Sequence, residues 1–234
     1  MKHLESARFG GAPRFHGVDA RGRDAFDYID GDVAGRPWPA WVADQGSIAS
    51  VARLVRAYDD AMVELGVPAW AEGLRLPAPQ GIPESIAGAP TFIAHLDITP
   101  ENVVFREGRA FALIDFDLIR PGTRAEEVVN MLLWWGAWMP ESDREDVARR
   151  LDPVDTGALI VDAYGLDDAA RATLVDLSIN GADRSWFTMK SRAETLGGGW
   201  RRMWEEGVGD RILRRAQWLR DNHDELARAV GPTV

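Results

Sequence analysis

The chain carries at residues 92–105 the stretch Phe92-Ile93-Ala94-His95-Leu96-Asp97-Ile98-Thr99-Pro100-Glu101-Asn102-Val103-Val104-Phe105, and residues 112–117 read Ala112-Leu113-Ile114-Asp115-Phe116-Asp117. In the first stretch a histidine, an aspartate and an asparagine stand beside an apolar run, and in the second stretch two aspartates end such a run. Short apolar runs bounded by turn residues favour strands, so we expect strands at residues 103–105 and 111–114. The polar side chains would then gather at one end of a β-hairpin.

The register of this hairpin decides which polar side chains face each other. A two-residue turn at Gly108-Arg109 would place Asn102 opposite Asp115, with their Cβ atoms about 5 Å apart. A turn one residue earlier, at Glu107-Gly108, would place Asn102 opposite Leu113 instead. An amide oxygen and a carboxylate oxygen at that separation suit Mg²⁺, which prefers a few oxygen ligands together with water and substrate phosphate. The first register therefore predicts a magnesium site at Asn102 and Asp115.

Asp97 lies in the loop that leads into the hairpin, five residues before Asn102. It can stand beside a metal ion without binding it. A carboxylate there can orient a substrate hydroxyl and accept its proton, an effect worth roughly 10² to 10⁴ in rate. We interpret His95 as a residue that orients the loop, its ring donating to a backbone carbonyl or to Asp115. The combined pattern favours phosphoryl transfer, which depends on such positioning.

The composition limits the partners that the chain can have. It has 234 residues with 37 acidic and 27 basic side chains, and a net charge of −10 argues against nucleic acid or an anionic membrane as the main partner. No apolar run approaches the roughly 18 residues of a membrane span, and the first residues lack a secretory signal, so we expect a cytoplasmic protein. The absence of cysteine excludes disulfides, thiolate metal sites and a cysteine nucleophile.

The pattern of apolar residues predicts a small β-containing N-terminal part and a mostly helical remainder. Residues 13–18 and 24–29 alternate around a turn-rich spacer and indicate an antiparallel hairpin. The prolines and glycines of residues 30–41 mark a joint between two lobes, and residues 77–90, rich in the same residue types, are predicted to be irregular. Helical periodicity, with a cap at Ser47 for the first helix, predicts helices at residues 47–66, 124–138, 143–150, 156–164, 168–189 and 193–205 and a last helix that ends near residue 230.

Two groups of residues each allow a structural and a functional interpretation. Trp38 and Trp41 stand beside the predicted joint, where they either pack the joint or line a nucleotide cleft. Packing is the favoured interpretation, because large aromatic side chains are mostly buried. Glu205, Glu206 and Asp210 form an acidic cluster that is either a solvated helix face, which is favoured, or a site for a cationic acceptor.

The sequence resembles the aminoglycoside phosphotransferase and choline kinase family, distant relatives of protein kinases. The run from His95 to Asn102 is similar to the catalytic loop of that family, and Ile114-Asp115-Phe116-Asp117 is similar to its metal-binding segment. The resemblance implies an α+β, protein-kinase-like two-lobed fold with a truncated N-terminal β lobe and a large, mostly helical C-terminal lobe. The implied divisions are a partial N-lobe at residues 1–32, a lobe connector at 33–46 and a C-lobe with the catalytic loop and the metal-binding hairpin at 47–234.

The resemblance also implies a role for each matching residue. Asp97 would be the catalytic base, assisted by His95. Asn102 and Asp115 would hold Mg²⁺, with Asp117 and Glu101 as secondary candidates. The residues expected to contact ATP or GTP are Asp27, Tyr28, Ile29 and Ile114. The implied reaction is transfer of the γ-phosphoryl group to a hydroxyl of a small acceptor, and an aminoglycoside-like or choline-like cation is the acceptor type expected.

One departure from the family keeps a second function open. Lys2 and Lys190 are the only lysines, and neither stands in the order expected for the lysine that contacts ATP. The segment that resembles the later N-lobe begins close to Met1, so no strands for a phosphate-covering loop are expected. The alternatives are therefore a catalytically impaired kinase-like binding module and, third, a phosphohydrolase using two metal ions. An incomplete N-lobe would also leave a β edge exposed, which favours a homodimer.

Overall fold

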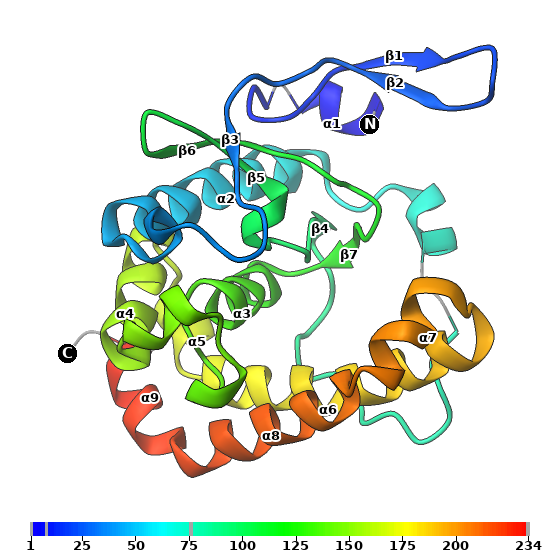
Figure 1. The fold of residues 1–234 in the computed structure, drawn as a ribbon. Coiled ribbons are helices and arrows are strands. Elements are labelled where there is room, and N and C mark those ends of the chain that lie inside the picture. Colours follow the sequence, from blue (N-terminus) through cyan, green and yellow to red (C-terminus); the bar gives the residue numbers. More distant parts are fainter. Residues whose placement is uncertain (1, 8, 75–76, 233–234) are drawn as a thin grey trace.

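The computed structural model describes residues 2–7, 9–74 and 77–232, and helices make up most of them (Figure 1). The α-helices are α1 (Lys2–Ser6), α2 (Gln45–Leu65), α3 (Arg124–Trp134), α4 (Pro153–Tyr164), α5 (Asp168–Arg171), α6 (Leu174–Thr195), α7 (Gly198–Glu205), α8 (Val208–Asp221) and α9 (His223–Val230). The strands are β1 (Phe15–Val18), β2 (Asp24–Phe26), β3 (Asp32–Val33), β4 (Phe92–Ala94), β5 (Val103–Arg106), β6 (Arg109–Leu113) and β7 (Arg120–Gly122). Five 3₁₀ helices complete the described elements: η1 (Ala40–Ala43), η2 (Ala69–Leu74), η3 (Pro100–Asn102), η4 (Glu141–Asp143) and η5 (Asp146–Arg150).

The described strands form three small antiparallel sheets, β1–β2, β3–β5–β6 and β4–β7. The β1–β2 hairpin confirms the hairpin expected near the N-terminus, with shorter strands, and it lies at one end of the molecule above the other strands (Figure 1). Strand β3 pairs with β5, with Asp32 opposite Phe105, so the predicted joint adds a strand to the β5–β6 hairpin. This strand and β7 are too short for the sequence pattern to indicate.

The register expected for the β5–β6 hairpin is wrong. The turn lies at Glu107-Gly108, where φ is 51° and 73°, as a type I′ turn requires. A bulge follows it, with Phe111 as the extra residue, because Phe105 pairs with Ala110 and Val104 with Ala112. Continued past the bulge, this register sets Asn102 beside Ile114, whose backbone N–H donates to the carbonyl oxygen of Asn102 over 2.9 Å. Asp115 thus follows the residue opposite Asn102 instead of facing it.

Gly31 is the point where the chain enters β3 against the back of β5. Its φ of 149° is in a region that residues with a Cβ rarely adopt, and an added Cβ would lie 2.5 Å from the carbonyl oxygen of Phe105. The neighbouring Asp30 accepts a hydrogen bond from Nε of Arg106 through its backbone carbonyl, over 2.7 Å. Close backbone approach therefore requires glycine at residue 31.

We expect Gly31→Ala to lower the free energy of unfolding by about 1–3 kcal/mol, because the new methyl group must displace backbone. Urea denaturation measures this. Gly35→Ala is the matched control, since no atom lies within 4 Å of a Cβ built there and its φ is ordinary. Equal stability of the two variants would contradict the tight contact at Gly31.

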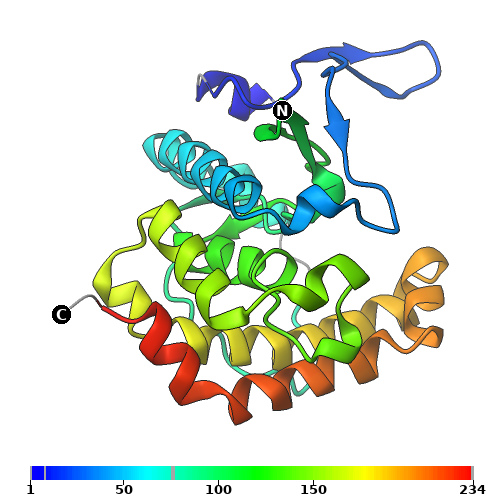
Figure 2. The same ribbon diagram turned by 60° about the vertical axis from the view of Figure 1, so that its left-hand side comes forward.

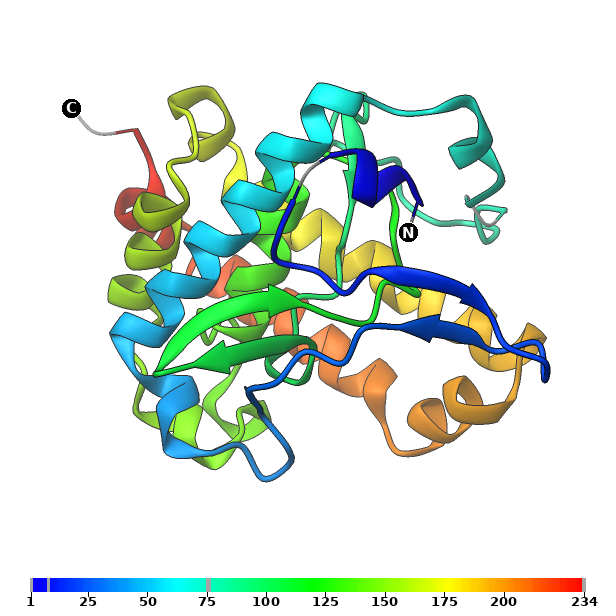
Figure 3. The same ribbon diagram turned by 90° about the horizontal axis from the view of Figure 1, so that it is seen from above.

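Helix α2 packs against β6 and α4 and forms one wall of the core (Figure 3). Its N-cap is Asp44, whose side chain accepts a hydrogen bond from the backbone N–H of Ser47 over 3.0 Å, so the cap expected at Ser47 is wrong. The helix ends at Gly66, where φ is 66°. About two turns before the end of the helix, Tyr58 is buried and its hydroxyl donates to the carbonyl oxygen of Ile93 over 2.8 Å, which fixes β4 to the helix.

Several helix boundaries differ from the expected ones. Helix α3 ends at Trp134 instead of at residue 138. Ala137 has a φ of 55°, which is not helical, and Gly136 lies so close to the carbonyl oxygen of Leu132 that a Cβ would not fit there. Residues 143–150 form 3₁₀ turns, and the helix expected at 168–189 is split into α5 and α6 at residues 172–173. Residues 77–90 contain no helix or strand, as expected.

The core lies between the strands and the long helix pair α6–α8, with α2 and α3 in the middle layer (Figure 2). Trp135 and Trp138 are almost fully buried, and their indole N–H groups donate to the carbonyl oxygens of Ile98 and Pro153 over 2.8 and 3.0 Å. Trp38 is also buried and Trp41 packs on Phe105, so the packing interpretation of the joint is confirmed. In the part of the chain that the structure describes, no helix is both long enough and apolar enough to cross a membrane.

Candidate active site

Side chains of helix α3 form hydrogen bonds to the backbone of the loop between β4 and β5. Asn130 accepts a hydrogen bond from the backbone N–H of Ile98 over 2.7 Å and donates to the carbonyl oxygen of Leu96 over 3.1 Å. Trp135 reaches the carbonyl of the same Ile98, whose side chain is fully buried. The backbone N–H and carbonyl of Ile98 are therefore both satisfied, by Asn130 of α3 and by Trp135 at the C-cap of that helix, which fixes the loop at this residue.

Glu127 is the strongest of these anchors. Its carboxylate is fully buried and accepts the backbone N–H of His95 and, over 3.0 Å, that of Leu96. Leu96 has a φ of 57°, an uncommon conformation for a side chain of this kind, and the two hydrogen bonds stabilise it. Burial raises the pKa of Glu127 to about 7, although the two N–H donors act in the opposite direction.

Asp97 and Asn102 are in direct contact at the mouth of the loop. The amide Nδ2 of Asn102 donates to the carboxylate Oδ2 of Asp97 over 2.9 Å and to its backbone carbonyl over 3.0 Å. Burial raises the pKa of Asp97, as does the nearby charge of Asp115, while the Asn102 hydrogen bond and the charge of Arg120 lower it. A carboxylate with a raised pKa in a fixed orientation suits a proton acceptor.

Asp115 completes the group from the other strand of the hairpin. Its φ of 62° turns the chain sharply after Ile114, and its charge acts on both Asp97 and His95. Since Nδ2 of Asn102 is used on Asp97, the amide Oδ1 remains as an acceptor facing away from that bond. The structure thus brings together Asp97, Asn102 and Asp115 as the sequence predicted, although by a different register.

His95 has the structural surroundings of a positioning residue. Its ring is buried, contacts the ring of Phe116 at a centroid distance of 4.7 Å, and its Nε2 lies 3.1 Å from the carbonyl oxygen of Ile114. Burial lowers the pKa of His95 to about 4, so the ring is neutral at neutral pH and donates to that carbonyl. It ties the loop between β4 and β5 to the segment after β6 that carries Asp115, which agrees with the interpretation that it orients the loop.

Glu101 and Asp117, the two secondary candidates, differ in their surroundings. Glu101 is occupied by Nε of Arg36 at 2.6 Å and by the indole N–H of Trp38 at 3.0 Å, and Arg36 also pairs with Glu145 at 2.9 Å. It therefore joins the catalytic loop to the connector. Asp117 is exposed, two residues after Asp115.

The four residues expected to contact a nucleotide lie on two segments. Asp27 is paired with His16, Tyr28 is 88% exposed and Ile29 is half-buried, all between β2 and β3. Ile114 lies in the site itself, between the carbonyl of Asn102 and Asp115. The structure therefore places only Ile114 directly beside the catalytic group.

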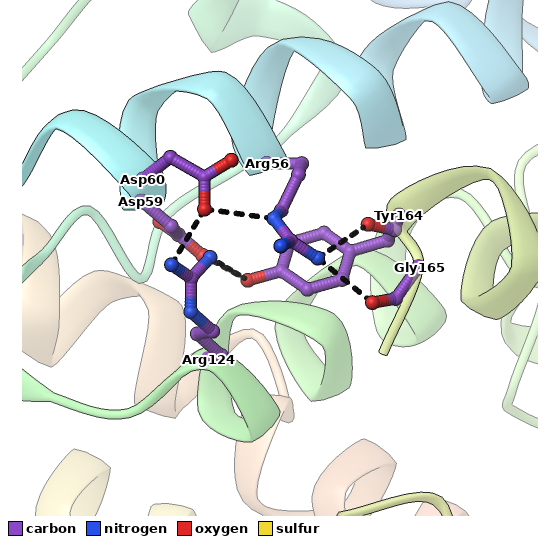
Figure 4. A network of polar contacts seen from close by, with 6 residues as sticks. All are labelled: Arg56, Asp59, Asp60, Arg124, Tyr164 and Gly165. Atoms are coloured by element: carbon purple, nitrogen blue, oxygen red, sulfur yellow. Dashed lines mark hydrogen bonds and ion pairs between the residues drawn. The ribbon is translucent and has the colours of Figure 1, made fainter. Parts of the chain in front are cut away.

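A polar network that includes the buried Asp59 and Tyr164 was not predicted from the sequence (Figure 4). Asp59 of α2 is fully buried and accepts the hydroxyl of Tyr164 over 2.5 Å, while Asp60 pairs with Arg124 at 2.6 Å and with Arg56 at 2.9 Å. Burial and the charge of Glu127 raise the pKa of Asp59. One feature of the sequence could have indicated the network. Asp59 lies within the apolar stripe of a helix, and a buried carboxylate requires a hydrogen-bonding or charged partner.

The comparison with protein families decides the identity of this fold. The model of the phosphotransferase enzyme family matches residues 14–159, which include the catalytic loop and the hairpin. The chain belongs to the phosphotransferase enzyme family. This confirms the resemblance stated from the motifs.

Three individual proteins are similar to this chain to different degrees. The chain is 29% identical over 190 residues to the trifolitoxin immunity protein of Rhizobium leguminosarum bv. trifolii, a match covering 75% of this chain and 66% of that protein. It shares 14% identity and a TM-score of 0.58 with a choline/ethanolamine kinase family protein from Mesorhizobium loti, over 97% of this chain and 80% of that one. An aminoglycoside phosphotransferase with bound ADP aligns with a TM-score of 0.48 and 12% identity, over 93% of this chain and 80% of that one. The similarity to the choline/ethanolamine kinase family protein, at a TM-score of 0.58, confirms the α+β, kinase-like fold class.

Proposed function

We propose that this phosphotransferase is a small-molecule kinase that transfers the γ-phosphoryl group of ATP or GTP to a hydroxyl group. The observation that carries the proposal is the hydrogen bond from Asn102 to the carboxylate of Asp97, with Asp115 adjoining both residues. Phosphoryl transfer requires an oriented base and oxygen ligands for a metal ion. Asp97 supplies the base, and the free amide oxygen of Asn102 and the carboxylate of Asp115 supply the ligands.

The reaction assigned to the site conserves atoms and charge. The oxygen of the acceptor hydroxyl forms a bond to the γ-phosphorus, and the bond from that phosphorus to the bridging oxygen of the nucleotide breaks. The electron pair of the broken bond leaves with the nucleoside diphosphate. Asp97 orients the hydroxyl and receives its proton, and the hydrogen bond from Asn102 keeps the carboxylate in the orientation for this step.

The residues present fit a magnesium ion. The free amide oxygen of Asn102 and the carboxylate of Asp115 are hard oxygen donors, and magnesium completes its six ligands with water and phosphate oxygens. The bound ion would neutralise charge on the transferring phosphate. In this proposal Asp117 is a further candidate, whereas Glu101 is already occupied by Arg36.

Nucleotide contact is assigned to Ile114 in the site and, on the connecting segment, to Asp27, Tyr28 and Ile29. The half-buried Ile29 and the exposed ring of Tyr28 supply apolar surface on which the purine ring of the nucleotide can pack. Isothermal titration calorimetry with MgATP and MgGTP tests the assignment, and release of diphosphate in the presence of hydroxylated acceptors tests the reaction. Absence of both binding and turnover with each nucleotide would contradict the proposal.

Substitution of Asp115 tests the metal site separately from the chemistry. We expect Asp115→Asn to raise the magnesium concentration needed for ATP binding by at least about tenfold, because a neutral amide replaces the carboxylate ligand. Calorimetry at several magnesium concentrations measures this change. Asp168→Asn, an exposed aspartate on α5, is the control and is expected to bind as wild type does. Identical magnesium dependence in Asp115→Asn would remove Asp115 from the site.

The relative from Rhizobium gives a second candidate, at the level of the biological role. It is named as an immunity protein for trifolitoxin and is 29% identical to this chain. The experiment compares wild type and Asp97→Asn for their ability to protect a sensitive strain against the toxin. It distinguishes protection by a phosphorylation reaction from protection by binding alone. Protection that depends on Asp97 supports modification of a toxin by phosphorylation, whereas equal protection supports the non-catalytic binding module.

A further inference from the structure

Two side chains of the segment between β3 and η1 meet at the carboxylate of Glu101, the residue directly before the proposed metal ligand Asn102. Nε of Arg36 donates to Oε1 of Glu101 over 2.6 Å, and the indole N–H of Trp38 donates to the same oxygen over 3.0 Å. Nη1 of Arg36 pairs at 2.9 Å with Glu145, the N-cap residue of η5. We refer to Arg36, Trp38, Glu101 and Glu145 as the connector clamp.

The surroundings of the connector clamp hold Arg36 in place. Trp38 is buried, and the guanidinium carbon of Arg36 lies 5.3 Å from the centroid of its ring. Nη2 of Arg150 in η5 donates to the backbone carbonyl of Ala40 over 2.9 Å, which joins the same two segments a second time. In the part of the chain that the structure describes, the two carboxylates of the clamp have no ion-pair partner besides Arg36. The guanidinium therefore bridges both carboxylates through different nitrogens, as its rigid fork of donors allows.

Glu101 and Asn102 belong to the same short turn, the 3₁₀ helix η3. The backbone N–H of Asn102 closes this turn by donating to the carbonyl oxygen of Thr99 over 3.0 Å. Helix α3 and its C-cap fix the loop before the turn, at Ile98, whereas the connector clamp fixes it within the turn, at Glu101. A displacement of Glu101 therefore also displaces Asn102, because the turn has only three residues.

We propose that Arg36 is a positioning residue for the metal site: through Glu101 it holds the turn that presents the amide oxygen of Asn102 to Mg²⁺. The inference rests on the proposed function and adds the connector to the parts of the chain that serve the site. The sign of the effect separates positioning from charge. Removal of a cation would by charge alone favour binding of Mg²⁺, because like charges repel, whereas a displaced ligand disfavours it.

Calorimetric titration of ADP at several magnesium concentrations tests the proposal. Arg36→Gln is expected to raise the magnesium concentration needed for half of the full ADP affinity by about three- to tenfold, less than for a direct partner of a metal ligand. Arg36→Lys keeps the charge without the fork and is expected to lie between this variant and wild type. Arg149→Gln is the matched control, because Arg149 is 49% exposed against 54% for Arg36 and pairs with Asp146. An unchanged or lower magnesium requirement in Arg36→Gln would overturn the proposal.

The indole resonance of Trp38 gives a readout that does not depend on activity. In ¹H–¹⁵N spectra this resonance is identified by its absence from Trp38→Phe. In Arg36→Gln it is expected to move toward its position in Glu101→Ala, where the indole N–H has lost its acceptor. An indole resonance of Arg36→Gln at the wild-type position would show that Glu101 stays in place without the arginine, and would overturn the proposal.

Two further measurements keep the outcomes distinct. Glu145→Gln loosens only the second contact of Arg36 and is expected to raise the magnesium requirement in the same direction by less, so the test does not depend on the folding of one variant. A wild type that binds ADP equally with and without magnesium would contradict the proposed metal site itself. A magnesium-dependent wild type with an unaffected Arg36→Gln would remove only the role of Arg36.

Discussion

Replacing Asp97 with asparagine is expected to lower kcat for phosphoryl transfer by about 10² to 10⁴, because the amide keeps the shape of the side chain but accepts no proton. The side-chain oxygen of the new residue can still accept the hydrogen bond that Asn102 donates over 2.9 Å in the wild type. Nucleotide affinity and thermal stability should therefore change little. Steady-state kinetics, calorimetry with MgATP and thermal denaturation of the same preparations measure the three quantities.

The pattern across these measurements distinguishes the base from a structural role. Loss of turnover with intact nucleotide binding identifies Asp97 as part of the chemistry. A matching loss in Asp168→Asn, the exposed control on α5, would point to a preparation effect. Wild-type turnover by Asp97→Asn would show that another group accepts the proton.

Replacing Glu127 with alanine is expected to have the second large effect, because it removes the acceptor for two buried N–H groups. A buried N–H group without an acceptor costs about 1–3 kcal/mol. Part of this cost is offset, because the substitution also removes a buried carboxylate and its desolvation cost. We expect a loss of about 2–4 kcal/mol in the free energy of unfolding and a loss of activity through a displaced loop. Urea denaturation and turnover measure both, and Glu127→Gln, which keeps one acceptor oxygen, is expected to lie in between.

The pH dependence of the free energy of unfolding gives an independent test of the burial of Glu127. Its pKa is raised by burial from 4.5 to about 7, so the folded state binds more protons than the unfolded state between these values. The contribution of Glu127 is therefore fully present below about pH 4.5 and is lost as pH rises through about 7. The difference in unfolding free energy between wild type and Glu127→Gln should fall across this range. A flat difference would show that Glu127 is ionised throughout.

The polar residues of the site could be predicted from the sequence because they are local. His95, Asp97 and Asn102 lie within one short loop, and Asp115 follows the next strand, so their spacing alone places them near each other. The register could not be predicted, because the bulge at Phe111 carries no local signal and alters the pairing after the turn has been chosen. The assignments of catalytic, metal and nucleotide roles stay predictions, as does the homodimer.

The supports of the site depend on tertiary structure and were missed for that reason. Glu127 and Asn130 lie on α3 and Trp135 caps its C-terminus, about thirty residues after the loop they hold, and only tertiary packing of this helix brings them to the loop. The position of Arg120 likewise follows from the pairing of β7 with β4, two strands that are each three residues long. Short strands and helix ends are set by the surrounding core, whereas the long periodic helix α2 was visible from its apolar residues.

The central claim is that Asp97, Asn102 and Asp115 act together in transferring phosphate to a hydroxyl. The most direct test is ³¹P nuclear magnetic resonance of reactions containing MgATP, a hydroxylated acceptor that supports release of diphosphate by the wild type, and either wild type or Asp97→Asn. We expect a new phosphate-ester signal that grows with wild type, together with ADP, and that is absent with Asp97→Asn. A wild-type reaction that yields inorganic phosphate alone, or an ester signal of equal rate with Asp97→Asn, would contradict the claim.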